Sequence, residues 1–253
     1  MVSNRQTLVK SIHNIFEKLA GAGFLLSIMS LFLLLSSDVD DMYEFANGIS
    51  DFFPWVVGFS LFTYVIDYLV FKFLNNRNTI KIILYMAFGY LIFMVNPMNV
   101  FMLLMGVMGL ICSLILYFGN RLAQSSNIFT YGFSIVVLIP LFIIINIDFT
   151  EKEGWKEVSS SSTFEATFDN FNGKHEIPIP LREGDTLTFY TTFNNENGGG
   201  HGLYMLNEND RKIGMKERNE NELQYYADQS GVYRIVIIGD DVKGSFTVNW
   251  KIE

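Results

Sequence analysis

One aspartate lies inside a long apolar stretch of the sequence, where a charged side chain is costly and usually has a partner or a function. Three other polar residues, Ser60, Thr63 and Tyr64, precede this aspartate, Asp67, and the four are separated by the three- and four-residue intervals of one helix face. We therefore expect one helix to carry a polar stripe that faces the interior of a helix bundle. Asp67 either pairs with a base near the helix end, such as Lys72 or Arg77, or takes part in a proton or ion path.

A loop rich in oxygen ligands is the second candidate site. It consists of Asn194, Asn195, Glu196 and Asn197, followed by the glycines 198 to 200. Carboxylate and amide oxygens are the ligands that calcium prefers, so the loop could hold calcium or a glycan, or it could be a solvated turn. The acidic pair Asp240 and Asp241, which lies in a glycine-rich corner, is either a turn or a ligand for the same cation.

The remaining sequence contains few residues that could perform catalysis. His175 and His201 are the only histidines after residue 147, and neither has a partner at metal-ligand spacing. The sequence has no nucleophile elbow, no zinc-protease motif and no phosphate loop. Cys112 is the only cysteine, which excludes an intramolecular disulfide. We predict a protein that is not an enzyme and has no resident cofactor except, at most, calcium.

The elements that carry these residues fall into two parts of different composition. Of the 26 acids and 18 bases, seven of each lie in the first 147 residues, which leaves 19 acids and 11 bases in the last 106. The first part is apolar and the second is polar and acidic, a composition typical of a membrane-embedded half joined to a folded polar domain. An acidic domain also argues against nucleic acid as a partner.

Five apolar runs in the first part approach the roughly 20 residues that a helix needs to cross a bilayer. They span residues 19–36, 52–73, 80–95, 98–119 and 128–147. The third run is short, and Asn96-Pro97 separates it from the fourth, because proline ends a helix near the preceding residue. We predict an α-helical bundle of about five transmembrane helices in which the third and fourth form a tight hairpin.

The bases of this part predict its orientation, since short cytoplasmic loops are enriched in lysine and arginine. They are Arg5, Lys10, Lys18, Lys72, Arg77, Lys81 and Arg121. All seven fall on one side of the predicted bundle, whereas the loop of residues 37–51 carries acids only. The N-terminus is then cytoplasmic and the polar domain extracytoplasmic. If the first run were a cleaved signal peptide, four crossings would give the same result; an even number of crossings for the whole chain would reverse it.

Residues 1–18 show apolar residues at helical spacing with polar residues elsewhere around the helix. This pattern predicts an interfacial helix on the inner leaflet. It is either a lipid-sensing or partner-docking element, or simply the lead-in to the first span.

The second part changes to an alternation with a period of two, typical of strands that are buried on one face. Residues 148–162 are charged and serine-rich and are interpreted as a stalk. Residues 163–253 contain roughly eight short alternating runs separated by turn signals, which predicts an antiparallel β-sandwich or jelly roll. Pro178 and Pro180 should confine their run to a sheet edge or a bulge.

Four segments of this domain carry a resemblance. They are Glu183-Gly184-Asp185-Thr186-Leu187, Tyr225-Tyr226-Ala227, Ser230-Gly231-Val232-Tyr233-Arg234-Ile235 and Gly244-Ser245-Phe246-Thr247-Val248. Together they resemble the bacterial pre-peptidase C-terminal type of β-sandwich and its jelly-roll relatives. The resemblance covers about residues 163 to 252 and implies an extracytoplasmic binding module, sometimes stabilised by calcium, without catalytic residues.

Two classes of function follow from these features. The first is a non-enzymatic membrane protein whose bundle anchors a β domain that binds a protein partner, a ligand or an envelope polymer. The second is a transport component or membrane-permeabilising effector whose bundle is gated by the β domain, which would be a cytoplasmic sensor if the helix count is even. Five aromatic residues could line a carbohydrate surface or belong to the core, namely Trp155, Tyr190, Tyr204, Tyr225 and Tyr226. Glycines in the helices would permit homo-oligomer contacts.

Overall fold

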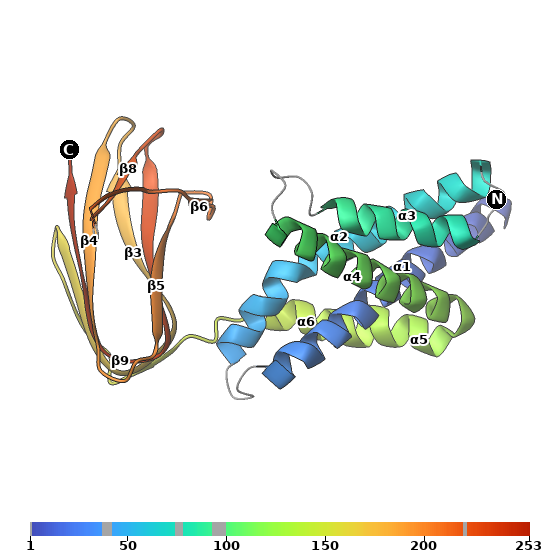
Figure 1. Ribbon diagram of the computed structural model, residues 1–253, viewed down its shortest axis with the longest axis horizontal. Helices are drawn as coiled ribbons and strands as arrows, with labels where there is room; N and C mark the ends of the chain where they lie inside the picture. Colours follow the sequence, from blue (N-terminus) through green and yellow to red (C-terminus); the bar gives the residue numbers. More distant parts are fainter. Residues whose placement is uncertain (1, 37–41, 74–77, 93–99, 220–221) are drawn as a thin grey trace. The chain divides into compact units, whose positions relative to one another are not determined.

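The computed structural model describes residues 2–36, 42–73, 78–92, 100–219 and 222–253. The chain divides into two compact units, which we call the helical unit (Met1–Asp148) and the β unit (Phe149–Glu253). Figure 1 shows helices in the first and strands in the second. The division confirms the predicted combination of a helical N-terminal part and an antiparallel β C-terminal part.

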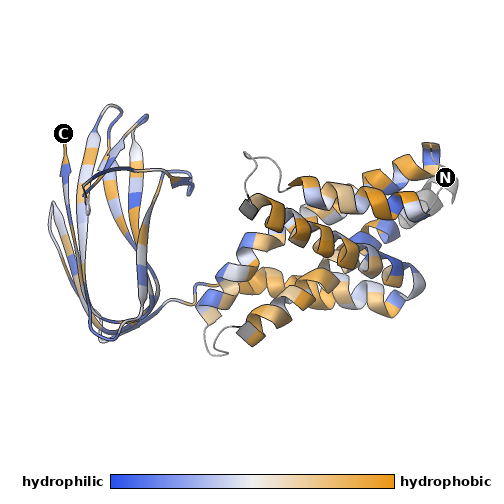
Figure 2. Ribbon diagram, viewed as in Figure 1, coloured by the Kyte–Doolittle hydropathy of each residue, from blue (hydrophilic) through white to orange (hydrophobic). Residues whose placement is uncertain are grey.

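The helical unit consists of long helices and one interrupted helix. Its elements are α1 (Val2–Ser36), α2 (Met42–Phe73), α3 (Asn78–Leu91), α4 (Val100–Ser125), α5 (Asn127–Tyr131), a π-helical segment (Gly132–Val137) and α6 (Leu138–Ile144). Four segments are long and apolar enough to cross a membrane: Ser11–Leu35, Met42–Phe73, Met102–Ser125 and Asn127–Ile144. Figure 2 shows hydrophobic residues along most of these helices.

The third predicted span corresponds to α3, which is 14 residues long. At 1.5 Å per residue such a helix extends about 21 Å, less than the roughly 30 Å of a hydrocarbon core. The end of the predicted span, residues 93–95, and the Asn96-Pro97 corner lie outside the described residues. The count of five crossings therefore stays a prediction.

Two boundaries differ from the sequence interpretation. The predicted loop 37–51 is wrong from residue 42 onward, because α2 begins at Met42, where Phe45 and Ile49 bury their side chains against α1 and α6. The predicted interfacial helix 1–18 has no end of its own, since α1 continues unbroken to Ser36. Lys18, which we expected on the polar side of that helix, is 3% exposed.

The last predicted span is a helix with a wide turn in its middle. The π-helical segment precedes Pro140, which has no amide hydrogen and whose ring crowds the carbonyl group four residues earlier, at Val136. A π-helical turn accommodates such a mismatch within an otherwise continuous helix.

Contacts between side chains show that successive helices alternate in direction. Near one end, Lys18 of α1 meets Asp67 of α2 and Tyr85 of α3. Near the other end, Leu26 of α1 packs with Ile49 of α2 and Leu138 of α6. We call the first end the basic end, because α2, α3 and α4 carry further bases near it. These bases are Lys72, Lys81 and Arg121.

Glycines bring the helices close together inside the chain. A methyl group on Gly23 of α1 would lie 2.2 Å from the carbonyl oxygen of Phe133, and one on Gly89 of α3 would lie 2.6 Å from that of Gly109. The helix glycines that we considered for contacts between copies thus serve contacts within one copy.

The β unit is built around two long strands. Its strands are β1 (Glu151–Glu153), β2 (Lys156–Ser159), β3 (Thr163–Leu181), β4 (Thr186–Asn195), β5 (Gly200–Leu206), β6 (Lys212–Ile213), β7 (Lys216–Asn219), β8 (Glu222–Tyr226) and β9 (Gly231–Ile252). All pair antiparallel in the order β1-β3-β9-β4-β8-β7, with β2 on β3 and β5-β6 on β9. We expected short strands, but β3 and β9 are 19 and 22 residues long.

These two strands change partners along their length. The register between β3 and β9 shifts between Phe168 and Gly173, so Asn172-Gly173, which the sequence predicts as a turn, is an irregularity within a strand. Along β9, residues 234–240 pair with β5 and residues 244–252 pair with β4. Figure 1 shows the resulting two layers facing each other. Side chains from both layers form one core.

The predicted stalk is wrong for residues 151–159, because β1 and β2 pair with β3. Trp155 between them packs against the core and stacks on Phe168 at a centroid distance of 5.5 Å. The prediction for the prolines is confirmed: among the described residues, the stretch Ile177–Leu181 pairs with β9 alone and forms a sheet edge.

Candidate functional site

Asp67 is the centre of a polar cluster within the helical unit. Its Oδ2 lies 2.6 Å from Nζ of Lys18, on α1, and its Oδ1 lies 3.7 Å from Nζ of Lys81, on α3. The same Lys18 ammonium donates a second hydrogen bond, of 2.9 Å, to the hydroxyl of Tyr85. Three helices are therefore joined through one carboxylate. The structure pairs Asp67 with Lys18 and Lys81 rather than with Lys72, and Arg77 lies outside the described residues.

The polar stripe on α2 supports this cluster from one side. Ser60 and Thr63 are fully buried, and the Ser60 hydroxyl donates to the carbonyl oxygen of Lys18. Thr63 donates to the carbonyl oxygen of Ser60 at 2.6 Å. Tyr64 differs from the other three, because its side chain is 40% exposed and lies on the outer face of the helix. Ser60 thus fixes the α1 backbone at the point where Lys18 leaves it.

The α4 helix contributes a residue that sequence reasoning missed. Asn120 is 3% exposed and its Nδ2 donates to the Tyr85 hydroxyl at 3.4 Å. Lys18 and Tyr85 were missed as well, because Lys18 was counted only as a loop base and Tyr85 only as part of an apolar run. The available signal for Lys18 was its position directly before the uncharged apolar run 19–36.

The cluster is reached from outside through a small polar cavity. This cavity, of about 130 Å³, lies among α2, α3 and α4, and Asp67 and Tyr85 form part of its wall. The remaining wall is made by residues that carry amides, bases or a phenol: Asn78, Lys81, Tyr117, Asn120, Arg121 and Gln124. Chemically, the arrangement can clamp helices together and can present two cations at an opening.

The structure brings the oxygen-rich loop and the acidic pair together. Asn197 donates from Nδ2 to the carbonyl oxygen of Asp241 at 2.6 Å and accepts the amide of Lys243 at 3.0 Å. Asn195 accepts the amide of Gly198 at 2.8 Å and donates to the carbonyl oxygen of Gly199 at 2.6 Å. Both amide oxygens are thus used to close the turn and attach it to β9.

The same loop offers little to a cation. Among the described residues, no three His, Cys, Asp or Glu side chains are grouped as metal ligands would be. The other predicted members, Asn194, Glu196 and Asp240, have exposed side chains. The contacts show how the turn is closed, and the calcium interpretation stays a prediction.

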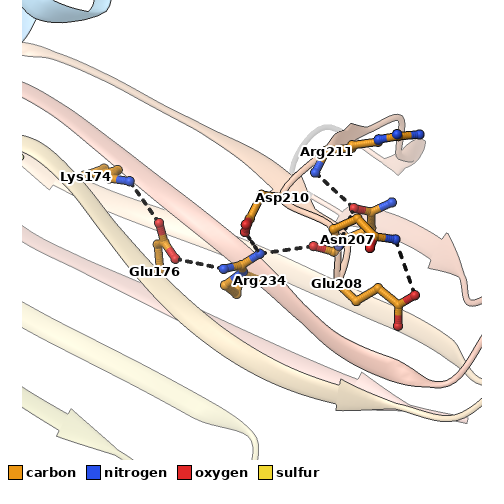
Figure 3. Close-up of polar contacts among 8 residues, drawn as sticks. Lys174, Glu176, Asn207, Glu208, Asp210, Arg211 and Arg234 are labelled. Carbon is orange, nitrogen blue, oxygen red and sulfur yellow. Dashed lines mark hydrogen bonds and ion pairs between the residues drawn. The ribbon is translucent and has the colours of Figure 1, made fainter. Parts of the chain in front are cut away.

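A second polar network, absent from the sequence interpretation, surrounds Arg234 of β9 (Figure 3). Its guanidinium pairs with Asp210 and donates to the carbonyl oxygen of Asn207 at 3.1 Å. On the other side it lies 3.6 Å from Glu176 of β3, which also accepts from Lys174 at 3.1 Å. The arginine thereby attaches the β5-β6 turn to the edge of the sheet, which is a structural task.

His175 lies in a cluster of rings and charges on β1, β2 and β3. Its Nδ1 is 2.8 Å from Nζ of Lys152, and its ring lies 5.0 Å from that of Trp155. Withdrawal from water, reinforced by the Lys152 charge, lowers the pKa of His175 to about 4. The neutral ring is a packing element rather than an acid-base group near pH 7.

The five aromatic residues considered for a carbohydrate surface do not share one environment. Tyr190 and Tyr226 are 49% and 59% exposed. Trp155 and Tyr225 are partly buried against the core, and Tyr204 is partly buried beneath Lys212, whose ammonium lies 4.8 Å from the ring centroid. Only the first two tyrosines offer ring faces to a ligand.

Comparison with known proteins identifies no relative. No family model matches the chain, and no curated protein is significantly similar to it.

Proposed function

We propose that the protein is a non-enzymatic multi-pass membrane protein whose helical unit anchors the β unit, and that the β unit binds a protein partner or an envelope polymer outside the cytoplasm. The observation that carries this proposal is the apolar exterior of the helical unit, which surrounds an interior containing several polar side chains. Its interior holds Lys18, Ser60 and Thr63, whereas Trp55 and Phe71 are 71% and 69% exposed. Such an exterior is stable in lipid and costly in water.

The Asp67 cluster supports an anchor more than a transport path. The carboxylate already has two lysines as partners, so its charge is compensated by fixed groups on α1 and α3. A proton or ion path would need further ionisable groups along the bundle, and Asp67 is the only acid in the apolar run 52–73.

The alternation of the helices supports an extracytoplasmic β unit. The ends of the described helical unit, α1 at the start and α6 at the finish, lie at opposite ends of the bundle (Figure 1). Because lysine and arginine gather at the basic end, that end is expected in the cytoplasm. The resemblance to pre-peptidase C-terminal domains also implies an extracytoplasmic β unit.

A second candidate rests on the short α3. If this 14-residue helix does not cross, the number of crossings becomes even and the β unit lies in the cytoplasm. The protein would then be a membrane effector or transport component whose β unit senses a soluble signal.

Cysteine labelling of intact cells separates the two. We would replace Cys112 by serine, introduce Asn194→Cys, and apply a membrane-impermeant thiol reagent. Asn194 is suited to this purpose because its side chain is exposed and the loop is held by its neighbours Asn195 and Asn197. Labelling without lysis is expected.

A matched variant, Ser125→Cys at the end of α4, should label only after lysis, because α5 and α6 separate it from the β unit. If Asn194→Cys labels only after lysis and Ser125→Cys labels in intact cells, the extracytoplasmic assignment is wrong and the sensor becomes the better interpretation.

A further inference from the structure

The cavity at the basic end carries an excess of positive charge. Lys81 and Arg121 line it from α3 and α4, against the single carboxylate of Asp67, which Lys18 already holds at 2.6 Å. The other described carboxylate at this end, Glu17, lies 3.5 Å from His13 and is not part of the cavity wall. The opening therefore has net positive charge.

Arg121 is the cation of the cavity that is available to a ligand. Among the residues that the structure describes, it forms no ion pair or side-chain hydrogen bond, and its side chain is exposed. A guanidinium presents paired donors that match two oxygens of a phosphate group. The amide of Asn78 at the first residue of α3 lines the same cavity, and the N-terminal end of a helix favours an anion.

A second cavity continues from the first along α4. It has a volume of about 290 Å³ and shares Arg121 and Gln124 with the polar cavity. All its lining residues belong to α4, so it is an open hollow along one face of that helix, and its apolar members, Phe118 and Leu122, are 56% and 45% exposed. Phe118, Arg121, Leu122 and Ser125 recur at helical spacings of three and four residues, so they share one face of the helix.

We propose that these two adjoining cavities form a binding site for an anionic phospholipid, with the phosphate between Lys81 and Arg121 and the start of an acyl chain against Phe118 and Leu122. A free phosphate would use only the polar cavity and would leave the apolar one without an occupant. Basic pockets at the cytoplasmic ends of transmembrane helices take up lipid phosphates in this way. The inference rests on the membrane embedding of the helical unit proposed above.

The test uses the delipidated full chain in nonionic detergent, titrated with phosphatidylglycerol or phosphatidylcholine and followed by native mass spectrometry. Phosphatidylglycerol is expected to bind at least tenfold more tightly. Arg121→Gln should weaken that binding about tenfold, since one charge-assisted phosphate contact is lost, and should leave phosphatidylcholine unchanged. Lys81→Gln, a second variant, should act in the same direction.

Lys72→Gln is the matched control, because it removes an equal charge from the same end. Lys72 lies over the rings of Tyr68 and Phe73 and lines neither cavity. Its substitution should change the affinity less than twofold. Equal losses from Lys72→Gln and Arg121→Gln would show attraction by surface charge alone and overturn the site.

Competition by inorganic phosphate shows whether the site binds a whole phospholipid or only a phosphate group. At millimolar concentration it should compete only weakly with phosphatidylglycerol, because it cannot occupy the apolar cavity. Complete displacement would overturn the assignment to a lipid. Failure of the membrane embedding has a separate signature, namely release of the chain from membranes by alkaline carbonate.

Discussion

The helical unit and the β unit both have an apolar core, but they differ in the polar side chains they bury and in the residues they expose. In the helical unit a lysine, a serine, a threonine and an asparagine are hidden within the bundle, while large apolar side chains such as Phe32 cover the outside. In the β unit the interior is formed by phenylalanines and aliphatic residues, and charged residues lie on the surface. The contrast shows that the two units of one chain expose surfaces of different polarity.

The forces that hold the two units differ accordingly. Apolar burial stabilises the β unit, because its exterior is in water. In the lipid setting proposed above for the helical unit, that driving force between helices is absent, so close backbone packing and polar contacts would hold the bundle. Gly23 against Phe133 is an example of the first contact, and Lys18 with Asp67 of the second. Substitutions in the β unit should therefore lower stability through lost apolar burial, and those in the helical unit through lost polar or close backbone contacts.

The largest effect is expected from Phe246→Ala in the β unit. Phe246 is 1% exposed and contacts the rings of Phe164 and Phe168. Loss of a buried phenyl ring lowers the free energy of unfolding by about 3 to 5 kcal/mol. Urea unfolding of the segment 149–253, which should fold alone because its core is drawn entirely from this range, measures the change.

Tyr226→Ala is the control for this experiment. Tyr226 is 59% exposed, so its removal should cost less than about 1 kcal/mol. Equal losses from the two variants would contradict the view that apolar burial stabilises the β unit.

Asp67→Asn in the helical unit should lower the free energy of unfolding by about 3 kcal/mol, because it leaves the Lys18 ammonium buried without its counter-charge. Unfolding of the full chain by increasing dodecyl sulfate, followed by loss of helix signal, measures the effect. The double variant Lys18→Met, Asp67→Leu should regain most of the stability, since neither charge is then buried. A single variant as stable as the parent would show that the cluster does not hold the helices.

The smallest effect concerns pH and is specific to the β unit. Burial and Lys152 lower the pKa of His175 to about 4, whereas an unfolded chain protonates histidine near pH 6.5. The unfolded state therefore takes up a proton between these values that the folded state does not. The stabilisation is complete above pH 6.5 and is lost as the pH falls to about 4, with an expected change of about 2.5 kcal/mol between these values.

Comparing the segment 149–253 with its His175→Gln variant at several pH values isolates this contribution from the carboxylates. The variant should show a smaller loss of stability between pH 6.5 and 4. Identical pH profiles for the parent and His175→Gln would contradict the lowered pKa.

Local patterns were sufficient for much of the fold. The apolar runs around Leu26, Val70 and Leu116 predicted helices, and the alternation from Phe164 to Phe168 predicted a half-buried strand, because these signals depend on neighbours within one element. Pro178 and Pro180 predicted a sheet edge for the same reason: a missing amide hydrogen has consequences wherever the strand lies. The extra helical turns at the start of α2 were not predicted, because their apolar face is short and interrupted by Glu44 and Asp51.

The candidate site depended on contacts that no local pattern contains. The sequence by itself determined that Asp67 would need a partner inside a bundle, and that two parts of different polarity would follow one another. Only the tertiary structure decided that the partner is Lys18, 49 residues earlier, and that the Asn195 to Asn197 loop closes on Asp241. Side-chain spacing is set within an element by its backbone geometry, whereas the pairing of distant elements is decided by how their buried surfaces fit together.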